Sequence, residues 1–141
     1  PIGDKAVNEG TLIQFTISAT DADNDTLAYS ALNLPTGATF DSVTRTFSWT
    51  PNYAQAGIYP DVTFQVTDGY LTSQETIAIS VNQPYPDWDV NADSKTNVLD
   101  MIRIGQHWGE IGVVGWMPED VNEDGNINVL DMILVGQHWT G

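Results

Sequence analysis

One segment occurs twice in the second half of the chain, and this duplication constrains the fold more than any other feature. The copies cover residues 89–108 and 120–139, so each position of the first copy has a counterpart in the second. Fourteen of the 20 aligned positions are identical. Each copy begins with alternating Asp and Asn residues and continues with an apolar stretch. This pattern is typical of an oxygen-rich loop that leads into a helix.

The spacing of the oxygen-bearing side chains predicts a calcium site in each copy. Calcium prefers about six to eight oxygen ligands, which a twelve-residue loop supplies from side chains at positions 1, 3, 5, 9 and 12 and from the carbonyl of position 7. These positions are Asp89, Asn91, Asp93, Asn97 and Asp100 with the Lys95 carbonyl, and Asp120, Asn122, Asp124, Asn128 and Asp131 with the Asn126 carbonyl. An acidic surface turn is the alternative interpretation. Because the pattern occurs twice in register, it favours calcium at both loops.

Further residues refine this interpretation of the loops. Position 6 of such a loop needs a sharp turn, which Gly125 allows and Ser94 fits less well. The loops also lack a preceding helix, because Pro84 and Pro86 stand just before the first one. Each repeat is therefore expected to be a loop followed by one helix.

Each predicted helix carries two apolar stripes. The first has the spacing i, i+3, i+4, i+7, which we assign to a small core; its members are Met101, Ile104, Gly105 and Trp108, with Met132, Val135, Gly136 and Trp139. The second stripe contains Leu99, Ile102 and Gln106, with Leu130, Ile133 and Gln137. A module of this size has too little interior to bury both stripes, so the second is expected to be an interface. Alternatively, it packs on the other domain or on residues 109–119.

A duplicated loop–helix unit of this kind resembles a dockerin, over about Asp87 to Gly141. The resemblance implies a small all-α module with two calcium loop–helix repeats over residues 89–141, after a linker at 84–88. It also implies calcium-dependent binding to a cohesin domain of a scaffold or surface protein, as in cellulosome assembly. The positions that would contact cohesin are Val98, Leu99, Ile102, Arg103, Gln106 and His107, with Val129, Leu130, Ile133, Leu134, Gln137 and His138. Val-Leu stands in both repeats where common cellulosomal enzyme dockerins have Ser or Thr.

Residues 1–83 are expected to form an all-β, immunoglobulin-like sandwich. The candidate strands are 11–19, 26–32, 39–41, 46–49, 61–67 and 72–81, and Asp68-Gly69 indicates a hairpin turn. Phe47 and Trp49 alternate in one strand, which favours a core position for Trp49. The alternative, a sugar-stacking platform of Trp49, Tyr53, Tyr59 and Tyr70, is less favoured, so carbohydrate is not expected as a partner.

Several segments of this half resemble the bacterial and archaeal cadherin-like immunoglobulin family. They are residues 19–29, 34–37, 47–51 and 66–69. The resemblance implies a role like that of the X modules that precede many dockerins and stabilise them. It also implies a third calcium site, formed by Asp21, Asp23, Asp25 and Asp68. A solvated acidic turn between strands is the alternative.

The composition limits the function classes. The net charge is −15 with only four basic residues, so nucleic acid and anionic membranes are poor partners. The chain has no Cys, no apolar stretch long enough to cross a membrane and no arrangement typical of a catalytic site, so we do not expect an enzyme. Since it begins at Pro1, we expect a piece of a secreted or cell-surface protein. The alternative function is a structural calcium-binding spacer without cohesin docking.

Overall fold

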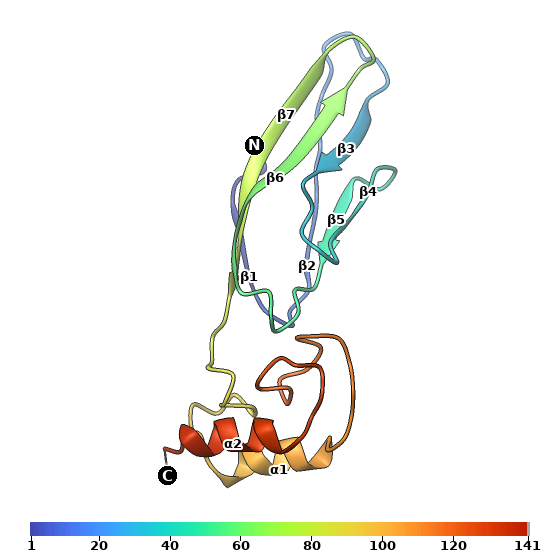
Figure 1. Ribbon diagram of the computed structural model, residues 1–141. Coiled ribbons are helices and arrows are strands. Elements are labelled where there is room, and N and C mark those ends of the chain that lie inside the picture. Colours follow the sequence, from blue (N-terminus) through green and yellow to red (C-terminus); the bar gives the residue numbers. More distant parts are fainter. Residues whose placement is uncertain (141) are drawn as a thin grey trace. The chain divides into compact units, whose positions relative to one another are not determined.

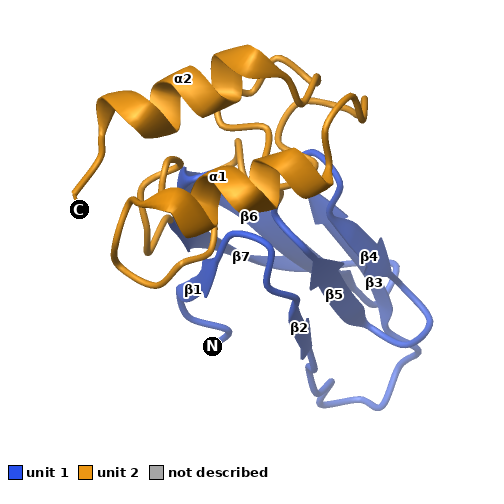
Figure 2. Ribbon diagram, turned by 90° about the horizontal axis from the view of Figure 1, so that it is seen from below, with its two compact units in different colours: residues 1–51, 56–82 blue, residues 52–55, 83–141 orange. Residues whose placement is uncertain are grey.

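The computed structural model describes residues 1–140, so Gly141, the last residue of the predicted second domain, lies outside the described residues. The chain forms two compact units (Figure 2). Unit 1 contains Pro1–Pro51 and Ala56–Asn82, and unit 2 contains Asn52–Gln55 and Gln83–Gly141. The predicted boundaries at residues 83 and 89 stay a prediction, since compactness alone does not show which segments fold independently.

Unit 1 is a sandwich of two β-sheets (Figure 1). Its strands are β1 (Lys5–Asn8), β2 (Ile13–Thr16), β3 (Ala28–Leu32), β4 (Thr39–Asp41), β5 (Thr46–Trp49), β6 (Gly57–Thr67) and β7 (Thr72–Asn82). One sheet has the order β1-β7-β6-β3 and the other has the order β2-β5-β4. β6 and β7 pair antiparallel around the turn that begins at Asp68. The hairpin predicted from Asp68-Gly69 is therefore confirmed.

Alternating side chains of the two sheets form the core of unit 1. Phe47 and Trp49 on β5 are both buried, as the sequence predicted. Phe47 stacks on Phe15 at 5.0 Å between ring centroids and meets Phe64 edge to face at 5.9 Å. The Trp49 indole N–H donates to the Thr36 carbonyl at 3.2 Å, so its polar atom is satisfied inside the sandwich. This packing leaves Trp49 unavailable as part of a sugar-stacking platform.

Two features of the strands differ from the prediction. β1 was missed because it is short and pairs parallel with β7, at the opposite end of the unit 1 sequence, which no local pattern reveals. β6 begins at Gly57 rather than at residue 61. The pairing with β7 shifts register between Tyr59 and Val62, around Pro60. Proline cannot donate to the ladder, and a bulge at this point lets the strand continue through it.

Unit 2 is not the small all-α module that the sequence analysis expected. Its helices are α1 (Val98–Gln106) and α2 (Val129–Gln137), of nine residues each. Its other described residues are turns, bends and loops, with one isolated β-bridge between Ile111 and Asn126. Taken as a whole, the described chain is mainly a β-sandwich with two short helices. The prediction was wrong because each loop and the connection between the repeats need non-helical backbone, which takes up most of the unit.

Both helices begin inside the predicted calcium loops rather than after them. Asn97 and Asn128 are the N-caps, and each forms a reciprocal capping box with Asp100 or Asp131. The helices end at their C-caps, His107 and His138, so Trp108 and Trp139 lie beyond the last turn and are about half exposed. The core positions predicted for these two tryptophans are therefore wrong.

The two helices pack against each other through their glycines. A Cβ atom at Gly105 would lie 3.6 Å from the Met132 methyl carbon, and one at Gly136 would lie 3.4 Å from that of Met101. Ile104 and Val135 are fully buried in the core of the unit. Both Cβ distances are ordinary van der Waals contacts, so a Cβ atom would also fit there, and the helix approach does not require glycine, contrary to the prediction from the sequence. In the described residues, neither helix has the length and apolar character needed to cross a bilayer.

Candidate metal centres

The first and last acidic side chains of each loop are buried and turned toward the loop backbone. In the first loop, Asp89 accepts from the N–H groups of Asp93 and Ser94 at 3.1 and 2.8 Å. Asp100 accepts from the N–H groups of Asn91 and Asn97 at 3.1 and 2.8 Å. Asp100 has 0% of its surface exposed. The loop therefore closes around its two terminal carboxylates.

The second loop repeats these contacts at the matching positions. Asp120 accepts from the N–H groups of Asp124 and Gly125 at 3.0 and 2.9 Å. Asp131 accepts from the N–H groups of Asn122 and Asn128 at 3.1 and 2.8 Å, and it is also fully buried. The duplication in sequence is thus a duplication of hydrogen-bonding geometry.

The middle positions of the loops present further oxygens. The Asn91 amide donates to the Asp93 carboxylate at 3.2 Å, and the Asn122 amide donates to the Asp124 carboxylate at 2.9 Å. The Asn97 side chain accepts from the Leu99 N–H at 2.9 Å because it also caps α1. Position 9 of such loops often contacts calcium through a water molecule, which is compatible with this second role.

Backbone strain distinguishes the two loops. Ser94 and Gly125 at position 6 have φ angles of 69° and 81°, in the left-handed region. Glycine adopts this region without steric cost, whereas serine does not. Ala92 and Glu123 at position 4 also have positive φ angles, 58° and 56°. Strain was therefore foreseen at Ser94, and missed at position 4, where neither residue type signals a turn.

The donor set and its charge fit a hard cation such as calcium. In the part of the chain that the structure describes, none of the loop carboxylates forms an ion pair with a basic side chain. Burial raises the pKa of Asp120, against the hydrogen bonds from Gly125 and Asp124, and the nearby Asp131 and Asp124 carboxylates raise it further. A buried cluster of like charges is unfavourable without a compensating cation. Oxygen ligands of Asp and Asn are those that calcium prefers.

Acidic side chains alone do not complete a metal site. Within residues 1–140, the structure gathers no group of three or more Asp, Glu or His side chains that could hold a metal ion by themselves. Calcium ligation in these loops would therefore also draw on the Asn side-chain oxygens and on the carbonyls of Lys95 and Asn126. The twelve loop residues stay a predicted ligand set.

Two acidic residues of the third predicted calcium site, Asp21 and Asp68, hydrogen-bond to the backbone of their own loops in unit 1. The Asp21 carboxylate accepts from the N–H groups of Asp23 and Asp25 at 2.9 and 3.0 Å. The Asp68 carboxylate accepts from the N–H groups of Tyr70 and Leu71. Each carboxylate thus caps its own loop, and the third site stays a prediction.

The second apolar stripe is exposed on both helices. Its aliphatic residues, together with the valine that begins each helix, are 47 to 53% exposed; they are Val98, Leu99 and Ile102 on α1, with Val129, Leu130 and Ile133 on α2. Gln106 and Gln137 are exposed at the ends of the same faces. Residues of the same type at matching positions thus have nearly equal exposure.

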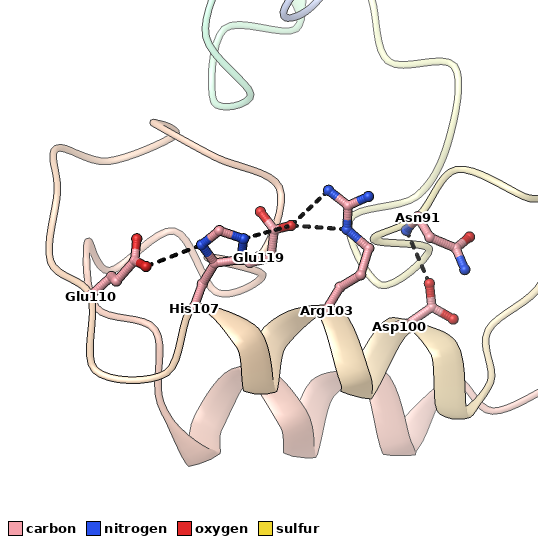
Figure 3. Close-up of polar contacts among 6 residues, drawn as sticks. All are labelled: Asn91, Asp100, Arg103, His107, Glu110 and Glu119. Carbon is pink, nitrogen blue, oxygen red and sulfur yellow. Dashed lines mark hydrogen bonds and ion pairs between the residues drawn. The ribbon is translucent and has the colours of Figure 1, made fainter.

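The remaining predicted contact residues are engaged within unit 2 (Figure 3). Arg103 donates to Glu119 through Nε and Nη2 at 3.0 and 2.9 Å, and His107 Nδ1 lies 3.2 Å from Glu110. At the matching positions of α2, Leu134 packs against the core and His138 stacks on Trp88. Sequence reasoning missed Glu119 and Trp88. The signal that could have identified them is their matching position in the two repeats, directly before the first residue of each loop.

The two sheets and their packed core define an immunoglobulin-like β-sandwich. A family model, He_PIG, described as "Putative Ig domain", matches residues 1–82, and the chain belongs to this family. Such domains are typically non-catalytic. No curated protein matches the chain.

Solved structures of several kinds are similar to this chain. An endo-fucoidan hydrolase from glycoside hydrolase family 107 is 19% identical with a TM-score of 0.51; the match covers 59% of this chain and 13% of that one. Human protocadherin-24 EC1-2 is 21% identical with a TM-score of 0.48, over 59% of this chain and 42% of that one. BT4661, a SusE-like surface-located polysaccharide binding protein from Bacteroides thetaiotaomicron, is 18% identical with a TM-score of 0.42, over 58% and 14%. The chain thus spans less than half the length of each. The likeness to the hydrolase shows the fold alone.

Proposed function

We propose that this chain is a calcium-dependent docking module, in which unit 2 binds a cohesin domain and so attaches its parent protein to a scaffold or cell surface. The observation that carries the proposal is the repeated half-exposed apolar face on α1 and α2, directly beside two loops with buried, unpaired carboxylates. The loops supply the metal dependence and the helix faces supply the contact surface.

The calcium part of the proposal follows from charge. Each loop carries three Asp residues in its sequence, two of them buried, and none of the three pairs with a basic side chain of the described residues. Two calcium ions would offset four negative charges and satisfy the oxygens of both loops. Since Asn97 and Asp100 belong both to the predicted ligand set and to the capping box of α1, calcium would stabilise the start of the helix.

The docking part of the proposal follows from exposure. Six aliphatic side chains on two short helices are about half exposed, which is unusual for a soluble unit unless the surface serves as an interface. The cohesin partner comes from the resemblance of the loop–helix repeats to a dockerin. A non-catalytic role of the immunoglobulin-like domain as a stabilising neighbour, and a secreted or surface location, complete the proposal.

The test is calorimetric titration of the chain against a panel of cohesin domains, with calcium and then with EDTA. We expect binding to at least one cohesin in calcium and none in EDTA. Leu99→Asp combined with Leu130→Asp should abolish this binding, because charges would replace the centre of both exposed faces.

A matched control is Leu71→Asp in unit 1, since Leu71 is exposed but lies outside the proposed surface. This variant should bind like the wild type. Calcium uptake without binding to any cohesin would contradict docking and favour the structural spacer instead. Loss of binding in Leu71→Asp as well would contradict the assignment of the surface to α1 and α2.

A further inference from the structure

The residue just before the second loop is a buried acid held by the helix of the first repeat. Glu119 precedes Asp120, the first predicted ligand, and is 1% exposed. One oxygen of its carboxylate accepts both hydrogen bonds from Arg103, and His107 Nε2 lies 4.0 Å from the same oxygen (Figure 3). Among residues 1–140, these two side chains of the first repeat are the basic partners of Glu119. A buried carboxylate depends strongly on such a partner.

The residue just before the first loop makes the reciprocal contact with different chemistry. Trp88 precedes Asp89 and is the counterpart of Glu119 in the first repeat. Its ring stacks on His138 at the end of α2, with 3.6 Å between centroids and 6° between ring planes. His138 Nδ1 lies 2.9 Å from the Leu134 carbonyl oxygen, which holds the imidazole against the helix end. Each loop is thus contacted, directly ahead of its first ligand, by the helix of the other repeat.

Backbone hydrogen bonds repeat this crossed arrangement at position 8 of each loop. The Gly109 N–H, after α1, donates to the Ile127 carbonyl of the second loop at 2.8 Å. The Thr140 N–H, after α2, donates to the Thr96 carbonyl of the first loop at 2.9 Å. The two donors occupy matching positions of the repeats, and so do the two acceptors. Each loop is therefore fixed at two points by the opposite repeat.

We propose that Arg103 and His138 are positioning residues, each of which sets the calcium affinity of the loop in the other repeat. Arg103 acts on the second loop through Glu119, and His138 acts on the first loop through Trp88. This inference rests on the proposed calcium binding. Residues behind the ligands orient them, and their loss commonly weakens metal binding about 10- to 100-fold. By linkage, an ion in one loop stabilises the contact with the opposite helix.

The test is a calcium chloride titration of the full chain followed by amide NMR. The N–H groups of Ser94 and Gly125, at position 6, report the first and second loop separately. We expect Arg103→Leu to lower the calcium affinity of the second loop about 10- to 100-fold and to leave that of the first loop within about threefold of the wild-type value. Leucine is the residue at the matching position of α2, so the helix tolerates it. Arg103→Lys should recover part of the affinity.

Further variants check the route through Glu119. Glu119→Gln should lower the calcium affinity of the second loop. Adding Arg103→Leu to this variant should lower it little further, because both substitutions remove the same ion pair. Glu110→Gln is the matched control: this acid faces the same His107 but is exposed, and its loss should leave both loops unchanged. In calcium-free chain, the Arg103 Nε–H should exchange slowly with solvent, and faster in Glu119→Gln. His138→Ala should lower the calcium affinity of the first loop and leave that of the second loop unchanged.

The outcomes separate this inference from the proposed function. If the wild type takes up no calcium, the proposed function and this inference both fail. If the wild type binds two ions and Arg103→Leu leaves both affinities unchanged, only this inference fails. It also fails if Arg103→Leu lowers the calcium affinity of the first loop, which leads directly into α1, more than that of the second loop.

Discussion

Position 6 of the two loops offers a matched pair of substitutions with opposite expected effects. Both residues have a left-handed backbone, but one is Ser94 and the other is Gly125. A Cβ atom at Gly125 would lie 2.7 Å from the Gly112 carbonyl oxygen, closer than real Cβ contacts allow. Ser94 already carries a Cβ atom at the matching position of the first loop. We therefore expect Gly125→Ala to destabilise unit 2 and Ser94→Gly to stabilise it.

The magnitudes follow from backbone and packing terms. A non-glycine residue in the left-handed region costs about 1–2 kcal/mol. Replacing glycine by alanine also stabilises the folded state by about 0.4–1 kcal/mol, because it lowers the conformational entropy of the unfolded chain. The clash with the Gly112 carbonyl adds about 1–3 kcal/mol. The free energy of unfolding should therefore fall by about 2–4 kcal/mol in Gly125→Ala and rise by about 0.5–1 kcal/mol in Ser94→Gly, from the same terms with the opposite sign and no clash.

Urea unfolding in saturating calcium, followed by circular dichroism at 222 nm, measures these changes. The signal reports unit 2 because both helices of the described chain lie there. Ala92→Gly, at another left-handed position of the first loop, is a control that should also stabilise the unit slightly. Unfolding free energies of Gly125→Ala and wild type that agree within about 0.5 kcal/mol would refute the assigned loop geometry.

Two further predictions concern unit 1. Phe47→Ala should lower its free energy of unfolding by about 3–5 kcal/mol, because the ring is fully buried against Phe15 and Phe64. Urea unfolding followed by the NMR signal of the Trp49 indole N–H, which is hydrogen-bonded inside the sandwich, measures this loss, and a loss below about 1 kcal/mol would contradict the core assignment. Backbone hydrogen bonds from Leu71 and then Tyr70 lower the pKa of Asp68, so a carboxyl-carbon NMR titration should give a pKa below 3.8. The contribution of Asp68 to hairpin stability should be present above the ordinary pKa and lost as the pH falls through the lowered one, whereas a pKa at or above 3.8 would contradict this capping role.

The features that the sequence predicted well are local ones. The alternation of Phe47 and Trp49 identified core residues, and Asp68-Gly69 identified the β6–β7 hairpin. The duplicated Asp and Asn pattern identified two loops with matching hydrogen bonds. Short-range side-chain chemistry determines all of these features, so they are visible in a few neighbouring residues.

The features that the sequence did not predict depend on distant residues or on exact helix ends. The pairing of β1 with β7 and the stack of Trp88 on His138 join residues far apart in the chain. The ion pair of Arg103 with Glu119 was also missed, while the partner contact predicted for Arg103 stays a prediction. The core role expected for Trp108 failed because α1 ends at Gln106, before the apolar spacing does.

The most direct test of the account is the calcium stoichiometry of the chain, measured together with its helical circular dichroism. Calcium-stripped chain would be titrated with calcium chloride in a calorimeter, and the same samples would be read at 222 nm. We expect two ions per chain and a gain of helical signal on binding, because the predicted ligands Asn97, Asp100, Asn128 and Asp131 also cap α1 and α2. No calcium uptake, or a helical signal that stays the same after removal of calcium with EDTA, would contradict it.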